Sequence, residues 1–352
     1  MTNIHSFLKA VAFRRRLLAW YDANARALPW RRFGAKLHRD PYPVWVSEIM
    51  LQQTRVAAVI GHYSEFLRRF PTVEKLAAAR EASVLAAWSG LGYYRRARMM
   101  HVAARVIVRE RGGEFPASAE EWRELPGIGR YTAAAIASIA FGEAAAVVDG
   151  NVERVLQRLS GKRLAGEKLW RTAGELLDRR RPGDFNQAMM ELGAVVCTPR
   201  SPGCLTCPVV ELCATRGELA GGAKAARPTK REIHYALDSR LDGRNGRAVF
   251  LVRRAPDARL MAGMWELPEL TAALRGKGKQ VPHSTRNGTA RGVGRSLLFS
   301  AKHSITTTDY TVRVWRSVAP PGVNGQWFSV SRLRRVALTG LARKILIKAD
   351  LA

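Results

Sequence analysis

Residues 125–151, LPGIGRYTAAAIASIAFGEAAAVVDGN, contain the pattern on which the predicted fold depends. Gly127 and Gly129 flank Ile128 in a predicted tight turn, and the Ala-rich run after it predicts a helix about 20 Å long at ~1.5 Å per residue. The glycines let a phosphate approach the backbone, and the unpaired N–H groups that open the helix carry partial positive charge. A phosphodiester can be held there without contact to its bases. The helix then carries the chain back, so Asp149 is expected near the bound backbone.

A Leu-Pro-Gly-x-Gly turn by itself also occurs at ordinary helix–turn–helix corners. The choice between such a corner and a DNA-binding hairpin therefore depends on the rest of the chain. Three other regions bear on it: an apolar helix with an embedded carboxylate, a glycine-rich loop with aromatic and basic residues, and a cluster of four cysteines.

The charge balance points to a polyanionic partner. The 352 residues carry a formal net charge of +29, of which +12 lies on residues 1–214 and +17 on residues 215–352. Because the sequence shows no isolated basic amphipathic helix, the excess of positive charge favours nucleic acid over a membrane surface as the partner. A GC-rich genome would also raise the number of arginines. Because no apolar run approaches the ~20 residues of a membrane span and no secretory signal pattern occurs, we expect a soluble cytoplasmic protein.

The segment PVWVSEIMLQQTRVA, residues 43–57, predicts a helix with Glu48 among apolar side chains. A carboxyl group in that setting loses hydration, which raises its pKa and favours the protonated form that a general acid needs. The alternative is a glutamate on the polar face of the helix. The adjacent Gln52 and Gln53 carry amide donors and acceptors that suit base edges. Upstream, Arg31 lies in a predicted non-helical segment and is a candidate to contact a ligand.

Residues 90–96, GLGYYRR, combine glycines, two aromatic rings and two arginines before a predicted helix. Leucine and aromatic side chains at such a turn can wedge into a base stack, while arginines contact phosphate. Simple loop packing is the alternative. The coincidence of glycine, aromatic and basic residues favours contact with DNA.

The chain contains only four cysteines, Cys197, Cys204, Cys207 and Cys213, all in one short segment. In an intracellular chain this clustering predicts metal ligation rather than disulfide bonds. Four thiolates at this spacing can hold either a zinc ion or a [4Fe–4S] cluster. Structural zinc sites more often use two close Cys pairs, so the single close pair favours the cluster.

Beyond residue 214 the pattern changes. Residues 215–234 are rich in Gly, Ala, Lys and Arg and predict a linker. Strands are predicted at 248–252, 296–299, 310–315 and 326–330, a basic loop at 276–294 and a closing helix at 338–349. We therefore expect a mainly α fold, with a helical domain over 1–214 and a smaller α+β domain over 235–352.

Five stretches resemble, in order and spacing, the MutY family of adenine DNA glycosylases in the helix–hairpin–helix superfamily: 47–54 (SEIMLQQT), 90–94 (GLGYY), 125–129 (LPGIG), 149–152 (DGNV) and 185–190 (FNQAMM). The resemblance covers nearly the whole chain and implies a two-lobed helical domain with a [4Fe–4S] loop. It implies hydrolysis of the N-glycosidic bond of adenine opposite 8-oxoguanine or guanine in double-stranded DNA, by a monomer. The related endonuclease III family carries a lysine where this chain has Tyr131, so strand cleavage by β-elimination is not expected.

The resemblance also implies residue roles. Glu48 would protonate adenine at N7, and Asp149 would stabilise the positive charge that develops on the sugar. Tyr131 and Asn151 would orient Asp149 and the sugar. The remaining implied contacts are those of Gly127 and Gly129 with phosphate, of Arg31 and Gln187 with the flipped base, and of Gln53, Leu91 and Tyr93 with the gap around the opposite base.

The C-terminal domain resembles the Nudix-like domain with which this family inspects 8-oxoguanine, on residues 263–268 (GMWELP) and 338–344 (LTGLARK). A glutamate-rich catalytic Nudix helix is absent, so pyrophosphohydrolase activity is not expected. The family's Phe-Ser-His recognition loop is replaced by Ile305, Thr306 and Thr307. Thr306 and Thr307 are the expected contacts to the oxidised base, and the neighbouring His303 or Asp309 is the alternative.

Two alternatives stay open. The first is a helix–hairpin–helix glycosylase for another mismatch, thymine opposite guanine, because Tyr131 and a cluster would suit that reaction too. The second is a DNA-binding iron–sulfur protein without enzymatic activity.

Overall fold

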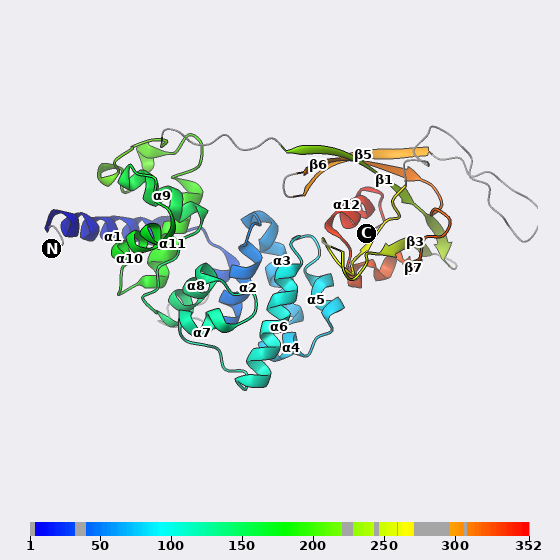
Figure 1. Cartoon of the computed structure of the whole chain (residues 1–352), viewed down its shortest axis with the longest axis horizontal. Helices are drawn as coiled ribbons and strands as arrows, with labels where there is room; N and C mark the ends of the chain where they lie inside the picture. Colours follow the sequence, from blue (N-terminus) through cyan, green and yellow to red (C-terminus); the bar gives the residue numbers. More distant parts are fainter. Residues whose placement is uncertain are drawn as a thin grey trace, which may run out of the picture. The chain divides into compact units, whose positions relative to one another are not determined.

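The structure is a computed structural model that describes residues 4–31, 40–219, 228–242, 246–258, 260–270, 296–305 and 308–351. The chain forms two compact units (Figure 1). We call Met1–Ala78 with Met99–Ala223 the helical unit, and Ala79–Arg98 with Lys224–Ala352 the mixed unit. No helix in the described part of the chain is both long and apolar enough to cross a membrane.

The helical unit is built around α8 (Arg130–Phe141), whose alanine-rich run 133–137 is buried throughout. Helices α2 (Pro41–Leu51), α7 (Ala119–Glu124) and α11 (Pro182–Val195) all pack against α8. A side chain at Gly183 would place its Cβ 2.5 Å from the carbonyl oxygen of Ser138, so glycine permits the close contact of α11 with α8. The other elements of this unit are α1 (Ile4–Asn24), η1 (Pro29–Arg31), α3 (Val56–Arg69), α4 (Val73–Ala77), residues 99–110 of α6 (Arg95–Glu110), α9 (Gly150–Ser160), α10 (Gly166–Leu176), η2 (Cys204–Thr206) and η3 (Val210–Leu212).

The hairpin between α7 and α8 is fixed at both ends. Ser118 and Glu121 form a capping box that starts α7, and Gly142 ends α8 in the left-handed conformation. Between the two helices, Leu125 and Ile128 turn their side chains into the core. The capping residues at both ends and the two buried side chains between them therefore determine where the hairpin lies.

The mixed unit contains two sheets and α12 (Gly340–Lys348). In the first sheet β6 (Thr308–Arg316) lies between β1 (Thr229–Leu237), to which it is parallel, and β5 (Ser296–Ile305), to which it is antiparallel. In the second, β3 (Gly246–Arg253) pairs antiparallel with β2 (Ser239–Asp242), β4 (Trp265–Glu266) and β7 (Gly325–Ser329). One apolar core joins both sheets to α12, through residues such as Val249 on β3, Val312 on β6 and Leu346 on α12.

The predicted architecture, a mainly helical domain followed by a smaller α+β domain, is confirmed, with two differences. Strand β1 begins at Thr229, so residues 229–234 belong to a sheet and the linker prediction is wrong for them. Residues 79–98, which include α5 (Glu81–Ala87) and the start of α6 (Arg95–Glu110), group with the mixed unit and not with the rest of 1–214. The predicted basic loop at 276–294 lies outside the described residues.

Candidate active site

Helix α2 places a carboxyl group in the core of the helical unit. Residues 42–50 of this helix are all buried, and Glu48 is only 6% exposed. Burial raises the pKa of Glu48 and so does the negative charge of Asp149, while the hydrogen bond from Tyr131 and the charge of Arg31 lower it; the net pKa is about 7. The direction is the one expected from the apolar pattern of the segment. At neutral pH this carboxyl group is therefore poised to donate a proton.

Tyr131, in the first turn of α8, contacts this acid directly. Its hydroxyl donates to Oε2 of Glu48 at 3.0 Å and lies 3.1 Å from the sulfur of Met190. The resemblance implied an orienting role toward Asp149. The hydroxyl is instead bonded to Glu48, because α2 packs against α8 and brings residues 48 and 131 together.

The second carboxylate, Asp149, is the N-cap of α9. Its Oδ1 accepts hydrogen bonds from the backbone N–H groups of Asn151 and Val152 at 2.9 and 2.7 Å, and its Oδ2 accepts one from Nδ2 of Asn151 at 3.0 Å. Donors of this kind at a helix N-terminus hold a capping carboxylate in a fixed position. Glu48 and Asp149 thus have contrasting surroundings, one apolar and one rich in donors, and they lie close enough to influence each other electrostatically.

A third buried carboxylate, Glu191 on α11, was missed by the sequence analysis. Its side chain is 1% exposed, and it accepts hydrogen bonds from Arg26 at 2.6 and 2.8 Å and from Arg31 at 2.9 Å. Burial alone would raise the pKa of Glu191, but the two arginines outweigh burial and lower the pKa to about 2. The available signal was a glutamate inside the apolar run FNQAMMELGAVV, the same signal that identified Glu48.

Arg31 and Gln187 have partners within the protein. Arg31 is held by Glu191, and its Nε is buried without a hydrogen-bond partner among the described residues. Gln187 is 5% exposed and donates to the carbonyl oxygen of Gly183 at 3.3 Å. Gln187 is therefore buried in the helical unit, whereas the side chain of Arg31 is 14% exposed.

The two hairpin glycines differ in what they do for the fold. Gly127 has φ 80°, and a Cβ there would lie 2.4 Å from Cβ of Met99. Gly129 has φ −94°, and a Cβ there would meet nothing within 4 Å. Folding therefore requires glycine at 127 but gives no internal reason for glycine at 129, where the surface is open to a bound group.

The other implied DNA contacts are distributed over both units. Of the two adjacent glutamines, Gln52 donates to Oγ1 of Thr132 at 3.0 Å, whereas Gln53 is exposed and has φ 53°. Leu91 and Tyr93 belong to the mixed unit, where Leu91 is 5% exposed and Tyr93 45% exposed. Thr306 and Thr307 lie outside the described residues.

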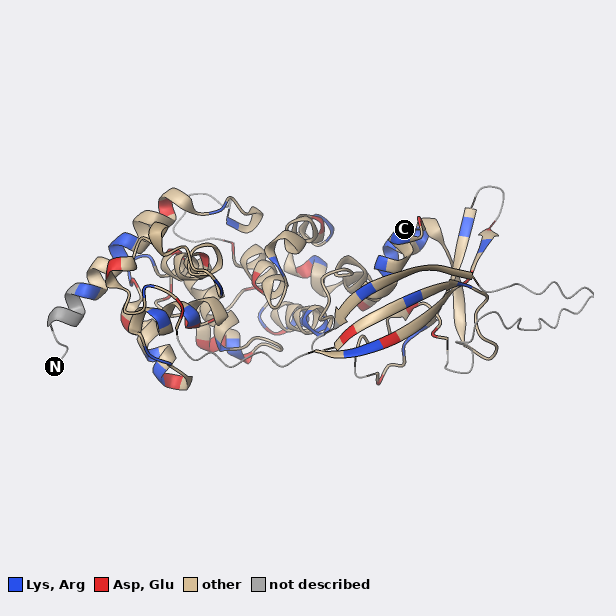
Figure 2. Cartoon of the chain, turned by 90° about the horizontal axis from the view of Figure 1, so that it is seen from above, with Lys and Arg blue, Asp and Glu red and all other residues tan. Residues whose placement is uncertain are grey.

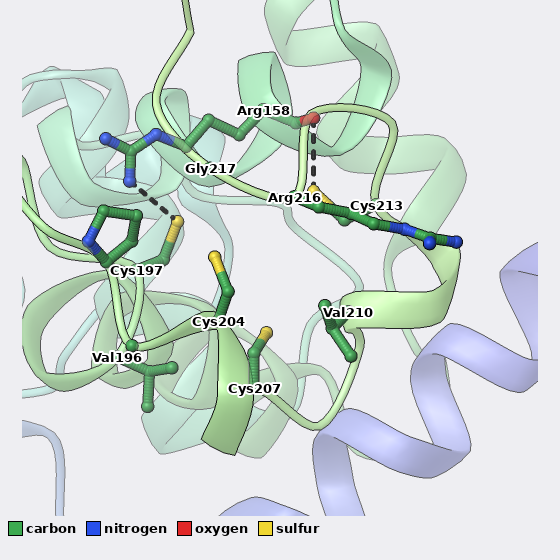
Figure 3. Close-up of a pocket in the computed structure, with 11 residues that line it drawn as sticks. Arg158, Val196, Cys197, Cys204, Cys207, Val210, Cys213, Arg216 and Gly217 are labelled. Atoms are coloured by element: carbon green, nitrogen blue, oxygen red, sulfur yellow. Dashed lines mark hydrogen bonds between the residues drawn. The ribbon is translucent and has the colours of Figure 1, made fainter.

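The four cysteines line one pocket of the helical unit, and none of them forms a disulfide bond (Figure 3). Arg158 braces both sides of this pocket: its Nη1 donates to Sγ of Cys197 at 3.3 Å, and its carbonyl oxygen lies 3.4 Å from Sγ of Cys213. Arg158 is itself buried, at 5% exposed, so this contact belongs to the interior of the helical unit. Cys197, Cys204, Cys207 and Cys213 are therefore gathered around one pocket, and four thiolates are the donor set of either a zinc ion or an iron–sulfur cluster.

Arg154 connects this pocket to the carboxylate turn. Its Nη2 donates to Oδ1 of Asn151 at 2.7 Å and to the carbonyl oxygen of Gly193 at 2.6 Å. Its Nε donates to the carbonyl oxygen of Cys197 at 2.8 Å. One side chain therefore ties the residue that supports Asp149 to the first cysteine of the pocket.

A hairpin that opens a buried helix, followed by a capping aspartate, is the arrangement of the helix–hairpin–helix DNA repair proteins. Residues 46–176 match the model of the HhH-GPD superfamily of base excision DNA repair proteins. Among solved structures, a thermostable thymine-DNA glycosylase superposes with a TM-score of 0.56 and 30% sequence identity, over 60% of this chain and 98% of that one.

Among curated proteins, human adenine DNA glycosylase is 42% identical over 318 residues, which cover 75% of this chain. The match covers 58% of the human protein, and the rat protein is covered to a similar extent, 62%. The adenine DNA glycosylase of Schizosaccharomyces pombe is 31% identical over 97% of this chain and 90% of its own length. This chain belongs to the adenine DNA glycosylase family.

Proposed function

We propose that this protein is a monofunctional DNA glycosylase that hydrolyses the N-glycosidic bond of adenine mispaired with 8-oxoguanine or guanine in double-stranded DNA. The observation that carries the proposal is the pairing of Glu48, buried with a pKa of about 7, with Asp149, which is surrounded by hydrogen-bond donors. Two carboxyl groups with opposite protonation states are what the hydrolysis of a glycosidic bond requires.

The reaction needs the adenine outside the base stack, because the glycosidic bond is inaccessible within a duplex. Glu48 then donates its proton to N7 of the base, which makes adenine a better leaving group. As the bond breaks, positive charge develops on the sugar, and the carboxylate of Asp149 stabilises it. Attack of water leaves an abasic site and free adenine. Tyr131 and Asn151 hold the two carboxyl groups in place through the hydrogen bonds described above.

Several features support duplex DNA as the partner. The hairpin offers an open surface at Gly129 next to the N–H groups that start α8. Lys and Arg are spread over the helices of the helical unit and the strands of the mixed unit (Figure 2). The buried Nε of Arg31, with no partner among the described residues, is a donor suited to an acceptor atom on a flipped base. Gln187 would complete that base pocket.

Cys197, Cys204, Cys207 and Cys213 would hold a [4Fe–4S] cluster, braced by Arg158. When bound, the cluster would crosslink the loop over residues 197–213 and contribute to folding, with no part in the hydrolysis. The mixed unit would read the opposite base in the manner of a Nudix-like domain, with Thr306, Thr307, Leu91, Tyr93 and Gln53 as contacts. We further propose that the protein acts as a monomer in the cytoplasm.

A second candidate is excision of thymine opposite guanine, favoured by the structural similarity to a thymine-DNA glycosylase. Duplexes containing A opposite 8-oxoguanine, A opposite guanine and T opposite guanine separate the two, with strand breaks scored before and after alkali. We expect alkali-dependent breaks at adenine alone. Glu48→Gln and Asp149→Asn should abolish base release while DNA binding stays largely intact. If the protein only binds DNA, neither substitution should change any measured activity.

A further inference from the structure

Residues 88–94 form a largely buried loop of the mixed unit that leads into α6, and within it the side chain of Tyr93 is exposed. Tyr93 has φ 47°, in the left-handed backbone region that residues other than glycine rarely adopt. The residue is 45% exposed. Gly90 and Gly92 flank it with φ 113° and 69°. Strained residues of this kind persist only where the surroundings hold them in place.

Some of the contacts that hold this loop lie within it. Trp88 donates through Nε1 to the carbonyl oxygen of Gly92 at 3.1 Å. The guanidinium of Arg96 lies over the rings of both Trp88 and Tyr93, 5.5 and 5.4 Å from their centroids, and donates to the carbonyl oxygens of Leu91 and Gly92. These contacts shape the turn and cover part of Tyr93, which stays 45% exposed.

The other contacts that hold the loop are hydrogen bonds to Leu338, far along the chain. The hydroxyl groups of Ser89 and Tyr94 both donate to the carbonyl oxygen of Leu338, at 3.0 and 2.9 Å. Nε of Arg343 donates to Oγ of Ser89 at 2.8 Å. We call this set the Leu338 clasp. Its members Ser89, Tyr94 and Leu338 are 3%, 2% and 1% exposed, so water does not compete for these hydrogen bonds.

The acceptor of the clasp is itself rigid. Leu338 forms a β-bridge with Trp265, and Thr339 caps α12 by accepting a hydrogen bond from the N–H of Ala342 at 3.1 Å. The carbonyl oxygen of Leu338 therefore has a fixed position between β4 and α12. A second link runs from the end of the segment, where Arg98 donates to the carbonyl oxygen of Ala262.

We propose that the Leu338 clasp is the device by which the C-terminal part of the chain positions Tyr93 for stacking on a nucleobase, so that Ser89, Tyr94 and Arg343 are positioning residues for recognition of the base opposite adenine. This inference rests on the proposed function. An exposed aromatic ring beside arginines is a stacking platform for bases, and stacking is strongest when the ring is held in its bound orientation beforehand. Without the clasp, the backbone at residue 93 relaxes toward negative φ and the ring loses that orientation.

The test is a double-mutant cycle between Tyr94→Phe and Tyr93→Ala, measured as single-turnover adenine release from duplexes with A opposite 8-oxoguanine and A opposite guanine. Tyr94→Phe removes one hydroxyl group and leaves the buried ring. We expect it to slow release opposite 8-oxoguanine by about fivefold to tenfold and to reduce the preference over guanine. In the Tyr93→Ala background it should have no further effect, because its action passes through the Tyr93 ring.

Tyr42→Phe is the matched control. The hydroxyl of Tyr42 is also buried and also donates to a backbone carbonyl, that of Phe70 at 2.8 Å, but it lies in the helical unit. Its loss should lower stability similarly while leaving the preference unchanged. Ser89→Ala removes the second donor and should reproduce the effect of Tyr94→Phe. Hydrogen exchange at residues 91–93 should rise in both clasp variants and not in the control.

Two results would overturn the inference while leaving the proposed function intact: equal effects of Tyr94→Phe with and without the Tyr93 ring, or an unchanged preference in both clasp variants. If the wild-type protein releases no adenine from either duplex, the proposed function fails and the inference fails with it.

Discussion

The hydroxyl of Tyr131 donates a hydrogen bond to Oε2 of Glu48 across 3.0 Å, between the first turn of α8 and the core of α2. This bond stabilises the carboxylate form of Glu48 and so opposes burial, which favours the neutral form. The pKa of about 7 is the balance of the two effects together with the charges of Asp149 and Arg31. Both protonation states of Glu48 are consequently populated at neutral pH.

The first prediction concerns pH. Because the reacting form of Glu48 is the protonated one, the single-turnover rate of adenine release should fall as pH rises through about 7, approaching a tenfold decrease per pH unit above it. Rates measured between about pH 5 and about pH 9, with saturating enzyme, test this. A rate that stays constant from about pH 6 to about pH 9 would show that Glu48 is not the proton donor.

Removal of the Tyr131 hydroxyl should move that midpoint. In Tyr131→Phe the carboxylate of Glu48 loses a donor, so its pKa rises and the pH profile shifts to higher pH, by about one unit. Tyr63→Phe is a suitable control, since the buried hydroxyl of Tyr63 donates to the carbonyl oxygen of Pro43 in the same unit. A shift to lower pH in Tyr131→Phe would contradict the geometry described here.

Glu48→Gln should lose activity and gain stability. The amide cannot donate an acidic proton, and we expect a decrease in rate of at least about a hundredfold with duplex affinity retained. Burial raises the pKa of Glu48 from 4.5 to about 7, so the contribution of this residue to stability is greatest below pH 4.5 and is lost as pH rises through about 7. The variant should therefore melt at a higher temperature than wild type at about pH 8 and show a smaller difference at about pH 5. Equal melting temperatures at about pH 8 would argue against a charged buried carboxylate.

The two hairpin glycines should respond differently to alanine. Gly127→Ala forces a side chain into the left-handed region and into Met99, and it should destabilise the protein by at least about 2 kcal/mol. Gly129→Ala meets no atom within 4 Å and should fold normally, yet its methyl group should weaken binding to an undamaged duplex about tenfold. Thermal melting and fluorescence anisotropy measure the two effects. If Gly129→Ala binds the duplex as tightly as wild type does, the phosphate does not bind at Gly129.

Arg154 should connect cluster content to base release. Arg154→Lys cannot reproduce the three hydrogen bonds to Asn151, Gly193 and Cys197, so Asp149 loses its support and the rate should fall about tenfold or more. Iron and acid-labile sulfide per chain should decrease in the same variant. Arg181→Lys, at an exposed ion pair with Asp22, should change neither quantity. Normal activity in Arg154→Lys would show that Asn151 holds Asp149 unaided.

Ligation by the cysteines can be tested directly. Cys204→Ser and Cys207→Ser should each lose the bound iron and sulfide. Their melting temperature should also fall, because the loop over residues 197–213 loses its crosslink. Metal analysis of the wild-type protein distinguishes the candidates, since a [4Fe–4S] cluster contains iron with inorganic sulfide and a structural site contains one zinc ion.

Local sequence rules were sufficient for the features that depend on near neighbours. The glycine that permits the turn at residue 127, the aspartate that caps α9 and the apolar run around Glu48 each act within a few residues, so the helical unit, its hairpin and the raised pKa followed from pattern alone. The gathering of the four cysteines around one pocket was equally predictable, because all four lie within one short segment.

Long-range pairing accounts for the rest. The first half of β1, TKRE, is polar and exposed, and it forms a strand only because it pairs with β6 nearly 80 residues later. Glu191 acquires a low pKa from arginines about 160 residues away, and residues 79–98 join the mixed unit through hydrogen bonds to Leu338. The order of residues specifies which chemical groups the protein carries and which helices present them. Tertiary contacts determine which of those groups meet, because hydrogen bonds between distant segments leave no local periodicity to read.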